Sequence, residues 1–124
     1  MTHREELIIN ANLMVVKGKG ILAADESTPT CTKRFTSIGV DSTEAKRNEY
    51  RDMLLTTPNM EDYISGVIFY DETFHQSTVK GNIPFTTHLL DKGVIPGIKV
   101  DMGANALSGH EDEKVTEGLD GLRK

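Results

Sequence analysis

Hydrophobic residues along the chain alternate between helical spacing and short continuous runs. Behind a capping box at residues 2–5, apolar residues recur every three or four positions as far as Val15, which predicts a helix. The apolar run 21–24 predicts a short buried strand. A second helix is predicted from Thr28-Pro29 to a stop at Gly39, because proline suits a first helical turn.

The same order of elements repeats further along the chain. Segments rich in branched apolar residues again alternate with helical patterns, which predicts βα units, a parallel sheet and the α/β class. The further predicted elements are a helix from Thr43 to Leu55 capped by Asp41 or Ser42, a buried strand from Ile64 to Tyr70, a helix from Pro84 to Leu90 and a strand from Val94 to Val100.

Composition narrows the class of protein. The chain has 124 residues and a net charge of −5 with scattered basic residues, which argues against nucleic acid as the main ligand. No apolar run is long enough to span a membrane, and the charged N-terminus does not resemble a secretory signal. A single cysteine, Cys31, cannot form an internal disulfide, so we expect a reducing compartment, with the cytoplasm as the default.

Each predicted strand is followed by an acid. The acids are Asp25-Glu26, Asp71-Glu72 and Asp101. In a parallel α/β sheet they would lie at the same carboxyl edge, where such enzymes place their chemistry. The alternative is that strand ends are polar by default and that these acids only cap helices.

Lys99 is the most informative single residue, because it lies in an otherwise apolar strand. Side chains alternate along a strand, so Lys99 and Asp101 share one face, while Ile98 and Val100 share the other. A buried ammonium group is costly unless it is paired or used, and Asp101 supplies a partner. The alternative is an edge strand from which Lys99 reaches water.

The segment after the first strand could bind a phosphate. Asp25 would share a face with Ile21 and Ala23, at the rim of a cavity. Hydroxyl groups follow at a helix N-terminus, with cations one turn later, an arrangement that suits phosphate. The alternative is an ordinary N-cap and a solvated helix face. The residues concerned are Ser27, Thr28, Thr30, Lys33 and Arg34.

The sequence gives little support for other kinds of functional site. The glycines around Lys19 lack the spacing of a phosphate-binding loop or a dinucleotide fingerprint. The four histidines show no metal-ligand spacing, and Cys31 has no partner base. The acidic patch 111–113 is predicted to be a solvated loop.

One string closely resembles the N-terminal signature of class I (Schiff-base) fructose-bisphosphate aldolases: Gly18-Lys19-Gly20-Ile21-Leu22-Ala23-Ala24-Asp25-Glu26-Ser27-Thr28. Further matches follow in the family's order and extend the resemblance over nearly the whole chain. They are Lys33-Arg34-Phe35 with Ser37-Ile38-Gly39, Tyr50-Arg51, Ile64-Ser65-Gly66-Val67-Ile68, Gly97-Ile98-Lys99-Val100-Asp101 and Gly118-Leu119-Asp120-Gly121-Leu122.

The resemblance implies a (β/α)8 TIM barrel that cleaves fructose 1,6-bisphosphate reversibly to dihydroxyacetone phosphate and glyceraldehyde 3-phosphate, in glycolysis and gluconeogenesis. The family uses no metal or other cofactor, because a lysine on a later strand forms an imine with the substrate ketone. Asp25 would engage the substrate hydroxyls, Asp101 would hold Lys99, and Asp25 and Lys99 are the expected catalytic residues. The residues expected to bind substrate are Asp25, Ser27, Thr30, Lys33, Arg34 and Lys99.

The resemblance also predicts the organisation of the chain. Residues 1–124 would form the N-terminal portion of one barrel domain, with about three of eight βα units and without the imine lysine. We therefore expect no turnover from this polypeptide alone, and a cytoplasmic homotetramer for the complete protein. The alternatives are a non-catalytic truncated fragment that acts by binding a partner, or a module that binds phosphosugars.

Overall fold

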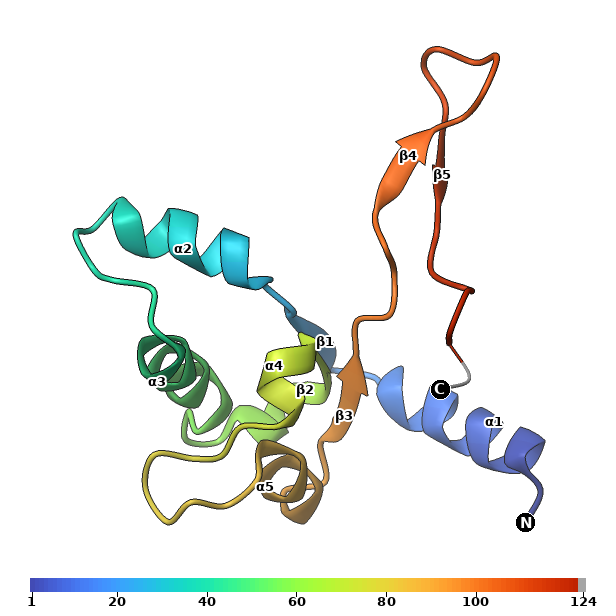
Figure 1. The fold of residues 1–124 in the computed structure, drawn as a ribbon. Coiled ribbons are helices and arrows are strands. Elements are labelled where there is room, and N and C mark those ends of the chain that lie inside the picture. Colours follow the sequence, from blue (N-terminus) through green and yellow to red (C-terminus); the bar gives the residue numbers. More distant parts are fainter. Residues whose placement is uncertain (123–124) are drawn as a thin grey trace.

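A three-stranded parallel sheet lies at the centre of the computed structural model, which describes residues 1–122 (Figure 1). The strand order is β1-β2-β3, and the register aligns Ala24 with Phe69 and Phe69 with Ile98. The carboxyl ends of the three strands therefore meet at one edge. The elements are α1 (His3–Met14), β1 (Gly20–Ala24), α2 (Thr28–Thr36), α3 (Glu44–Leu55), the 3-10 helix η1 (Met60–Asp62), β2 (Ile64–Phe69), α4 (Asp71–Phe74), α5 (Phe85–Asp91), β3 (Ile95–Ile98), β4 (Ala104–Ala106) and β5 (Lys114–Thr116).

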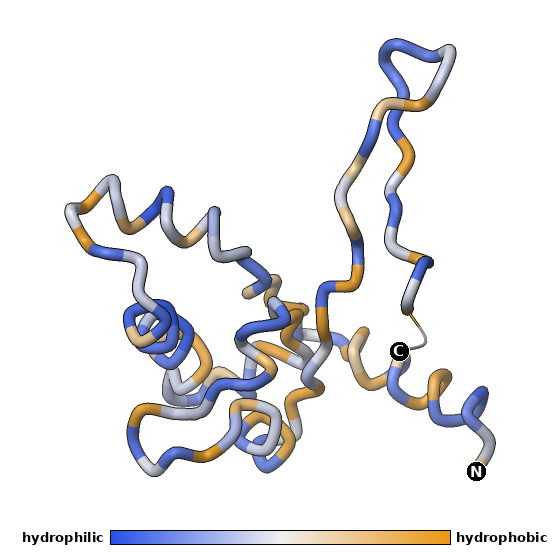
Figure 2. Tube along the Cα trace, in the orientation of Figure 1, coloured by the Kyte–Doolittle hydropathy of each residue, from blue (hydrophilic) through white to orange (hydrophobic). Residues whose placement is uncertain are grey.

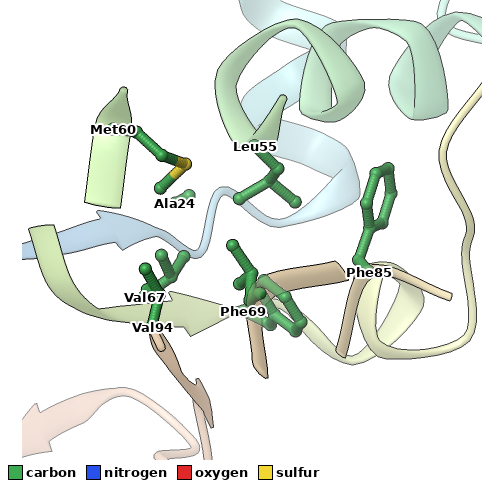
Figure 3. Close-up of a cluster of buried hydrophobic side chains, with 8 residues drawn as sticks. Ala24, Leu55, Met60, Val67, Phe69, Phe85 and Val94 are labelled. Atoms are coloured by element: carbon green, nitrogen blue, oxygen red, sulfur yellow. The ribbon is translucent and has the colours of Figure 1, made fainter. Parts of the chain in front are cut away.

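The hydrophobic core covers only one face of this sheet. Val67 and Phe69 of β2 are fully buried there, and alternation places Ala24 of β1 and Val94 beside them. Figure 3 shows Leu55 pointing from its helix towards Phe69, with Phe85 to one side of them. The core is completed by Met60 and Leu89. The helices α3 and α5 thus fix the orientation of the strands.

The opposite face of the sheet is open. Ile21 and Ala23 are exposed, so the prediction that the whole first strand is buried is wrong, because only Ala24 is buried in the core and Leu22 packs partly against it. Ile98 lies level with Phe69 on the core-facing side, but it is 40% exposed, and Val100 beyond the strand is 49% exposed, because the buried cluster does not extend to them. A compact monomer of 13.7 kDa would expose about 6,600 Å², whereas this chain exposes 9015 Å².

Two elements project away from the sheet (Figure 1). The helix α1 has the predicted capping box of Thr2 and Glu5 but buries none of its residues fully. At the other end, β4 and β5 form an antiparallel hairpin that the sequence did not predict, with exposed residues throughout both strands. Figure 2 shows that the loop joining them is largely hydrophilic, in agreement with the predicted solvated loop at 111–113. Within residues 1–122, no helix is both long and apolar enough to cross a bilayer.

Two predicted boundaries need correction. The third strand ends at Ile98 rather than Val100, although the Lys99 amide still donates to the Phe69 carbonyl at 2.8 Å and so prolongs the ladder by one bond. The third helix is capped by Thr43 and not by Asp41 or Ser42. The hydroxyl of Thr43 accepts the Lys46 amide at 3.2 Å, while Ser42 is occupied with Arg47.

The Thr43 cap gives a direct test of this correction. Thr43→Ala should lower the free energy of unfolding by about 1 kcal/mol, because it leaves a helix amide without its acceptor. Asp41→Ala is the matched control and should cost only a few tenths of a kcal/mol, as expected for a surface change. Urea unfolding of the chain, followed by circular dichroism, measures both. An equal or larger loss in Asp41→Ala would show that the cap has been assigned to the wrong residue.

Candidate functional site

Three charged side chains converge at the carboxyl edge of the sheet. The Lys99 ammonium Nζ lies 2.5 Å from an Asp101 carboxylate oxygen and 3.7 Å from Asp25 Oδ2. About a third of each of these side chains is exposed. The predicted meeting of Lys99 with both acids is therefore present, on the open face of the sheet.

Strand alternation explains this meeting. Ala24 is buried in the core, so its successor Asp25 projects to the opposite face. Ile98 pairs in register with Phe69, whose side chain faces the core. The next residue, Lys99, therefore projects to the same open face as Asp25. The strands β1 and β3, which are separated by β2, thus place opposite charges close together.

The ion pairs stabilise the charged forms of Lys99 and Asp101. The hydrogen bond from Lys99 to Asp101, supported by the charge of Asp25, raises the pKa of the Lys99 ammonium above its ordinary value. The same bond lowers the pKa of the Asp101 carboxyl. Lys99 therefore remains a cation at neutral pH and can donate to an anionic ligand.

The predicted phosphate segment lies directly after Asp25. Ser27 is the N-cap of α2, and its hydroxyl accepts the Thr30 amide at 3.4 Å. The hydroxyl groups of Ser27 and Thr30 are 3.1 Å apart, so both lie at the same end of the helix. The ordinary N-cap interpretation is thus correct, and it is compatible with anion binding because the helix N-terminus carries partial positive charge.

The predicted cations of α2 do not join the Lys99 cluster. Arg34 donates to Glu26 Oε1 at 2.5 Å and to the Tyr50 hydroxyl at 2.9 Å. The hydrogen bond to Glu26 raises the pKa of the Arg34 guanidinium. Lys33 is exposed, and within residues 1–122 no ion pair connects either cation to Asp25 or Lys99.

The acids at the strand ends divide between the two faces of the sheet. Asp25 and Asp101 point to the open face, whereas Glu26 and Glu72 lie on the helix side and bind arginines. Asp71 is 76% exposed at its side chain and lies 3.8 Å from His75. The predicted shared edge is present, but only two of the five acids meet at Lys99.

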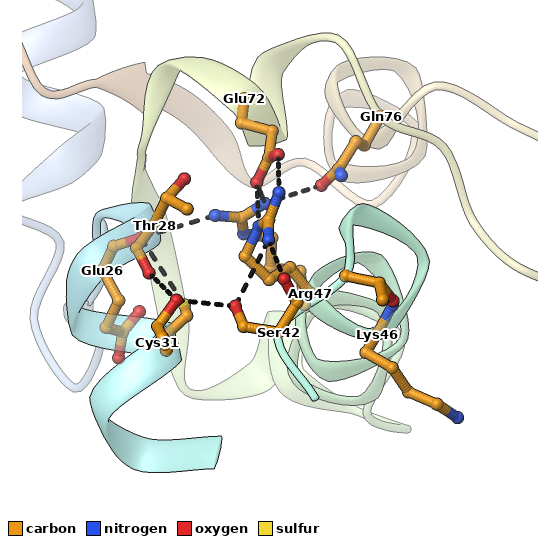
Figure 4. Close-up of polar contacts among 11 residues, drawn as sticks. Glu26, Thr28, Cys31, Ser42, Lys46, Arg47, Glu72 and Gln76 are labelled. Atoms are coloured by element: carbon orange, nitrogen blue, oxygen red, sulfur yellow. Dashed lines mark hydrogen bonds and ion pairs between the residues drawn. The ribbon is translucent and has the colours of Figure 1, made fainter. Parts of the chain in front are cut away.

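A buried polar network on the helix side was missed from the sequence (Figure 4). Arg47 donates to both Glu72 oxygens, at 2.9 and 2.6 Å, and Arg51 Nη1 donates to Glu72 Oε2 and, at 2.9 Å, to Gln76. These bonds to Arg47 and Arg51 outweigh desolvation and lower the pKa of Glu72 to about 2. Arg51 is only 2% exposed, so its charge depends on these partners.

Spacing along α3 could have revealed this network. Arg47, Arg51 and Leu55 recur at intervals of four, and all three are buried on one side of the helix. A guanidinium in line with a core leucine requires a carboxylate beneath it. Glu72 is the partner because α4 begins directly beyond β2.

The four hollows described within residues 1–122 are not lined by Lys99 or Asp25. A broad hollow of about 820 Å³ lies elsewhere, between the start of α3 and the 75–82 loop, and contains none of the predicted site residues. Smaller hollows of about 550 and 210 Å³ lie at the base of the hairpin, and Asp101 lines the second of them. Within residues 1–122, no three His, Cys, Asp or Glu side chains are placed so that they could hold a metal ion.

Comparison with known proteins assigns this arrangement to one family. The family model described as fructose-bisphosphate aldolase class-I matches residues 6–124. A probable fructose-bisphosphate aldolase class 1 from Xanthomonas campestris is 56% identical over 119 residues, which are 96% of this chain and 35% of that protein. The cytoplasmic isozyme from Cicer arietinum is 51% identical over 97% of this chain and 33% of its own length.

A solved structure agrees with these sequence matches. The fructose-bisphosphate aldolase of Plasmodium falciparum superposes with a TM-score of 0.85 and 45% identity, over 95% of this chain and 34% of that one. The chain therefore spans about a third of the length of the relatives that it matches. Its three parallel strands, with the helices beside them, have the fold of the N-terminal part of that α/β barrel.

Proposed function

Because the chain belongs to the class I fructose-bisphosphate aldolase family, we propose that it supplies part of the substrate site of an enzyme that cleaves fructose 1,6-bisphosphate reversibly to dihydroxyacetone phosphate and glyceraldehyde 3-phosphate. The observation that carries the proposal is the convergence of Lys99 with Asp25 and Asp101 at the carboxyl edge, next to the N-terminus of α2. The lysine that forms the Schiff base is proposed to lie on a later strand than β3.

In this proposal Lys99 binds a phosphate group of the substrate. An ammonium group has three N–H donors, of which Asp101 engages one at 2.5 Å, while Asp25 stands 3.7 Å away as an ion-pair partner. The remaining donors are available for a phosphate oxygen, and the raised pKa keeps the group charged. Asp101 holds the lysine in place, while the Asp25 carboxylate faces the substrate hydroxyls around the cleaved bond.

The N-terminus of α2 is proposed to assist at the same phosphate. The Ser27 and Thr30 hydroxyls lie together at 3.1 Å, at the positive end of a helix that starts two residues after the Asp25-Glu26 pair. Lys33 and Arg34 would add charge at longer range. Arg34 retains free guanidinium N–H groups, because its described bonds use only Nη1.

The remaining assignments are also proposals. We place residues 1–124 within a single barrel domain, of a protein that acts in the cytoplasm as a homotetramer and needs no metal. Similarity to a cytoplasmic isozyme supports the compartment. The open face of β1–β3 supports a barrel, because further strands would cover Ile21 and Ala23 there.

The proposal can be tested with a chimaera, in which this chain replaces the matching third of the Xanthomonas campestris relative. We expect the chimaera to cleave fructose 1,6-bisphosphate in a steady-state assay. We expect no turnover from the purified 124-residue chain, since three strands do not complete the imine site. A metal-independent cleavage rate from the chain alone, comparable with that of the chimaera, would refute the proposed division of the site.

A second candidate, a module that binds phosphosugars without turnover, is favoured by one observation. Lys99, Asp25 and the start of α2 all lie within this chain. Titration of the chain with fructose 1,6-bisphosphate, followed by NMR chemical shifts, separates the candidates. Shifts at Lys99 and Thr30 at micromolar ligand, together with an inactive chimaera, would favour the binding module over the enzyme.

A further inference from the structure

Glu26 lies between two residues of the proposed site, Asp25 and Ser27, but points away from them to the helix side of the sheet. Its carboxylate accepts Arg34 Nη1 at 2.5 Å and the Tyr50 hydroxyl at 3.4 Å. Its carbonyl accepts Arg51 Nη2 at 3.4 Å and faces the Cys31 thiol at 3.8 Å. Both the side chain and the backbone of one residue are thus held from the helices.

These contacts come from rigid elements. Tyr50 and Arg51 are neighbours in α3, and Arg51 is 2% exposed and fixed by Glu72 and Gln76. Tyr50 also packs edge-on against Phe35 of α2, with ring centroids 5.7 Å apart. The peptide that joins β1 to α2 is therefore tied to α3 at two atoms of Glu26.

From this geometry we infer that Arg34, Tyr50 and Arg51, named here the Glu26 clamp, position Asp25 and Ser27 for the proposed reaction. The inference rests on the proposed function. Alternation along the strand places Glu26 and Asp25 on opposite sides of the backbone, so fixing the first fixes the direction of the second. Tyr50 and Arg51 are positioning residues, since neither reaches the Lys99 cluster within the described chain, whereas Arg34 both holds Glu26 and is proposed to add charge at the phosphate.

If the clamp residues had a purely structural role, a different experimental result would be predicted. Buried ion pairs contribute little net stability compared with apolar residues of similar size. What these ion pairs supply here is a fixed geometry, because a planar guanidinium group donates its hydrogen bonds to its partners in only one arrangement. Arg47 shares the helix, the burial and the Glu72 partner of Arg51, but it does not contact Glu26. It is therefore a matched control for the stability that Glu72 pairing provides.

The test compares Arg51→Met with Arg47→Met in the chimaera. We expect kcat for fructose 1,6-bisphosphate cleavage to fall about tenfold or more in Arg51→Met, since small misplacements of a reacting group are costly. In Arg47→Met kcat should stay within about twofold of the parent, because its loss affects stability and not the Glu26 peptide. Rates are taken per folded molecule, with KM measured in parallel. Equal kcat values in the two variants would overturn the inference.

A second variant covers the case in which Arg51→Met does not fold. Tyr50→Phe keeps the ring against Phe35 and removes only the hydroxyl that contacts Glu26 and Arg34. It should lower kcat about threefold and leave thermal unfolding nearly unchanged, and a kcat equal to that of the parent would overturn the inference. An unsubstituted chimaera without activity is a separate outcome, because it contradicts the proposed function, and the inference falls with it.

Discussion

Lys99→Met is expected to lower kcat/KM of the chimaera for fructose 1,6-bisphosphate about 10²- to 10³-fold. The substitution keeps the length of the side chain but removes the ammonium that Asp25 and Asp101 share. Loss of one charged donor aimed at a substrate oxygen is typically worth two to three orders of magnitude. It also leaves the Asp25 and Asp101 carboxylates without the cation that lies between them. Steady-state cleavage at neutral pH measures the effect.

Lys92 offers a matched control for this change. It lies just before β3, at the opposite end of the strand from Lys99, and pairs with Glu61 at 3.0 Å. Its side chain is 28% exposed, against 34% for Lys99, so both substitutions break an ion pair of similar burial. Lys92→Met should change kcat/KM less than about twofold, as expected for a partly exposed pair remote from chemistry. Similar losses in both variants would mean that Lys99 is only a structural lysine.

Strand alternation was sufficient to predict the geometry of Lys99. The parity of positions 99 and 101, and of 23 and 25, follows from period two alone, and the meeting of Lys99 with Asp25 then requires only a parallel sheet. Strand alternation could not predict how far each apolar side chain is buried. Ile21 is apolar like a core residue, but the core helices cover the other face of the sheet, while Ile98 lies on the core-facing side at a strand end beyond the buried cluster.

The helix-side network and the hairpin were missed for different reasons. Arginines are typical of a solvated helix face, and although positions 47 and 51 fall on the same side of α3 as Leu55, the depth of their burial depends on where α3 crosses the sheet. Each hairpin strand has three residues, too few for a period-two pattern. Glu72 was predicted as an acid at the end of a strand. The side of the sheet on which it lies depends on how the chain turns from β2 into α4.

Glu72→Gln is expected to lower the free energy of unfolding by about 3–5 kcal/mol at pH 7, since it leaves two buried guanidinium groups without a counter-charge. The expected dependence on pH follows from the pKa of Glu72, which is about 2 in the folded state and 4.5 in the reference state. A lowered carboxyl pKa stabilises the fold above the unfolded value, and this contribution, about 3 kcal/mol, is lost as pH falls through the folded value.

The difference between Glu72→Gln and the parent should therefore be largest above pH 5 and should shrink towards zero near pH 2, where protonated Glu72 and glutamine are both neutral. Glu49→Gln is the matched control, because Glu49 pairs with Lys46 at 2.8 Å but is 53% exposed. It should cost less than about 1 kcal/mol at any pH. Urea unfolding followed by circular dichroism between pH 2 and pH 7 measures the three proteins. If the cost of Glu72→Gln at pH 7 were as small as that of Glu49→Gln, or constant down to pH 2, the guanidinium groups would not depend on the Glu72 charge.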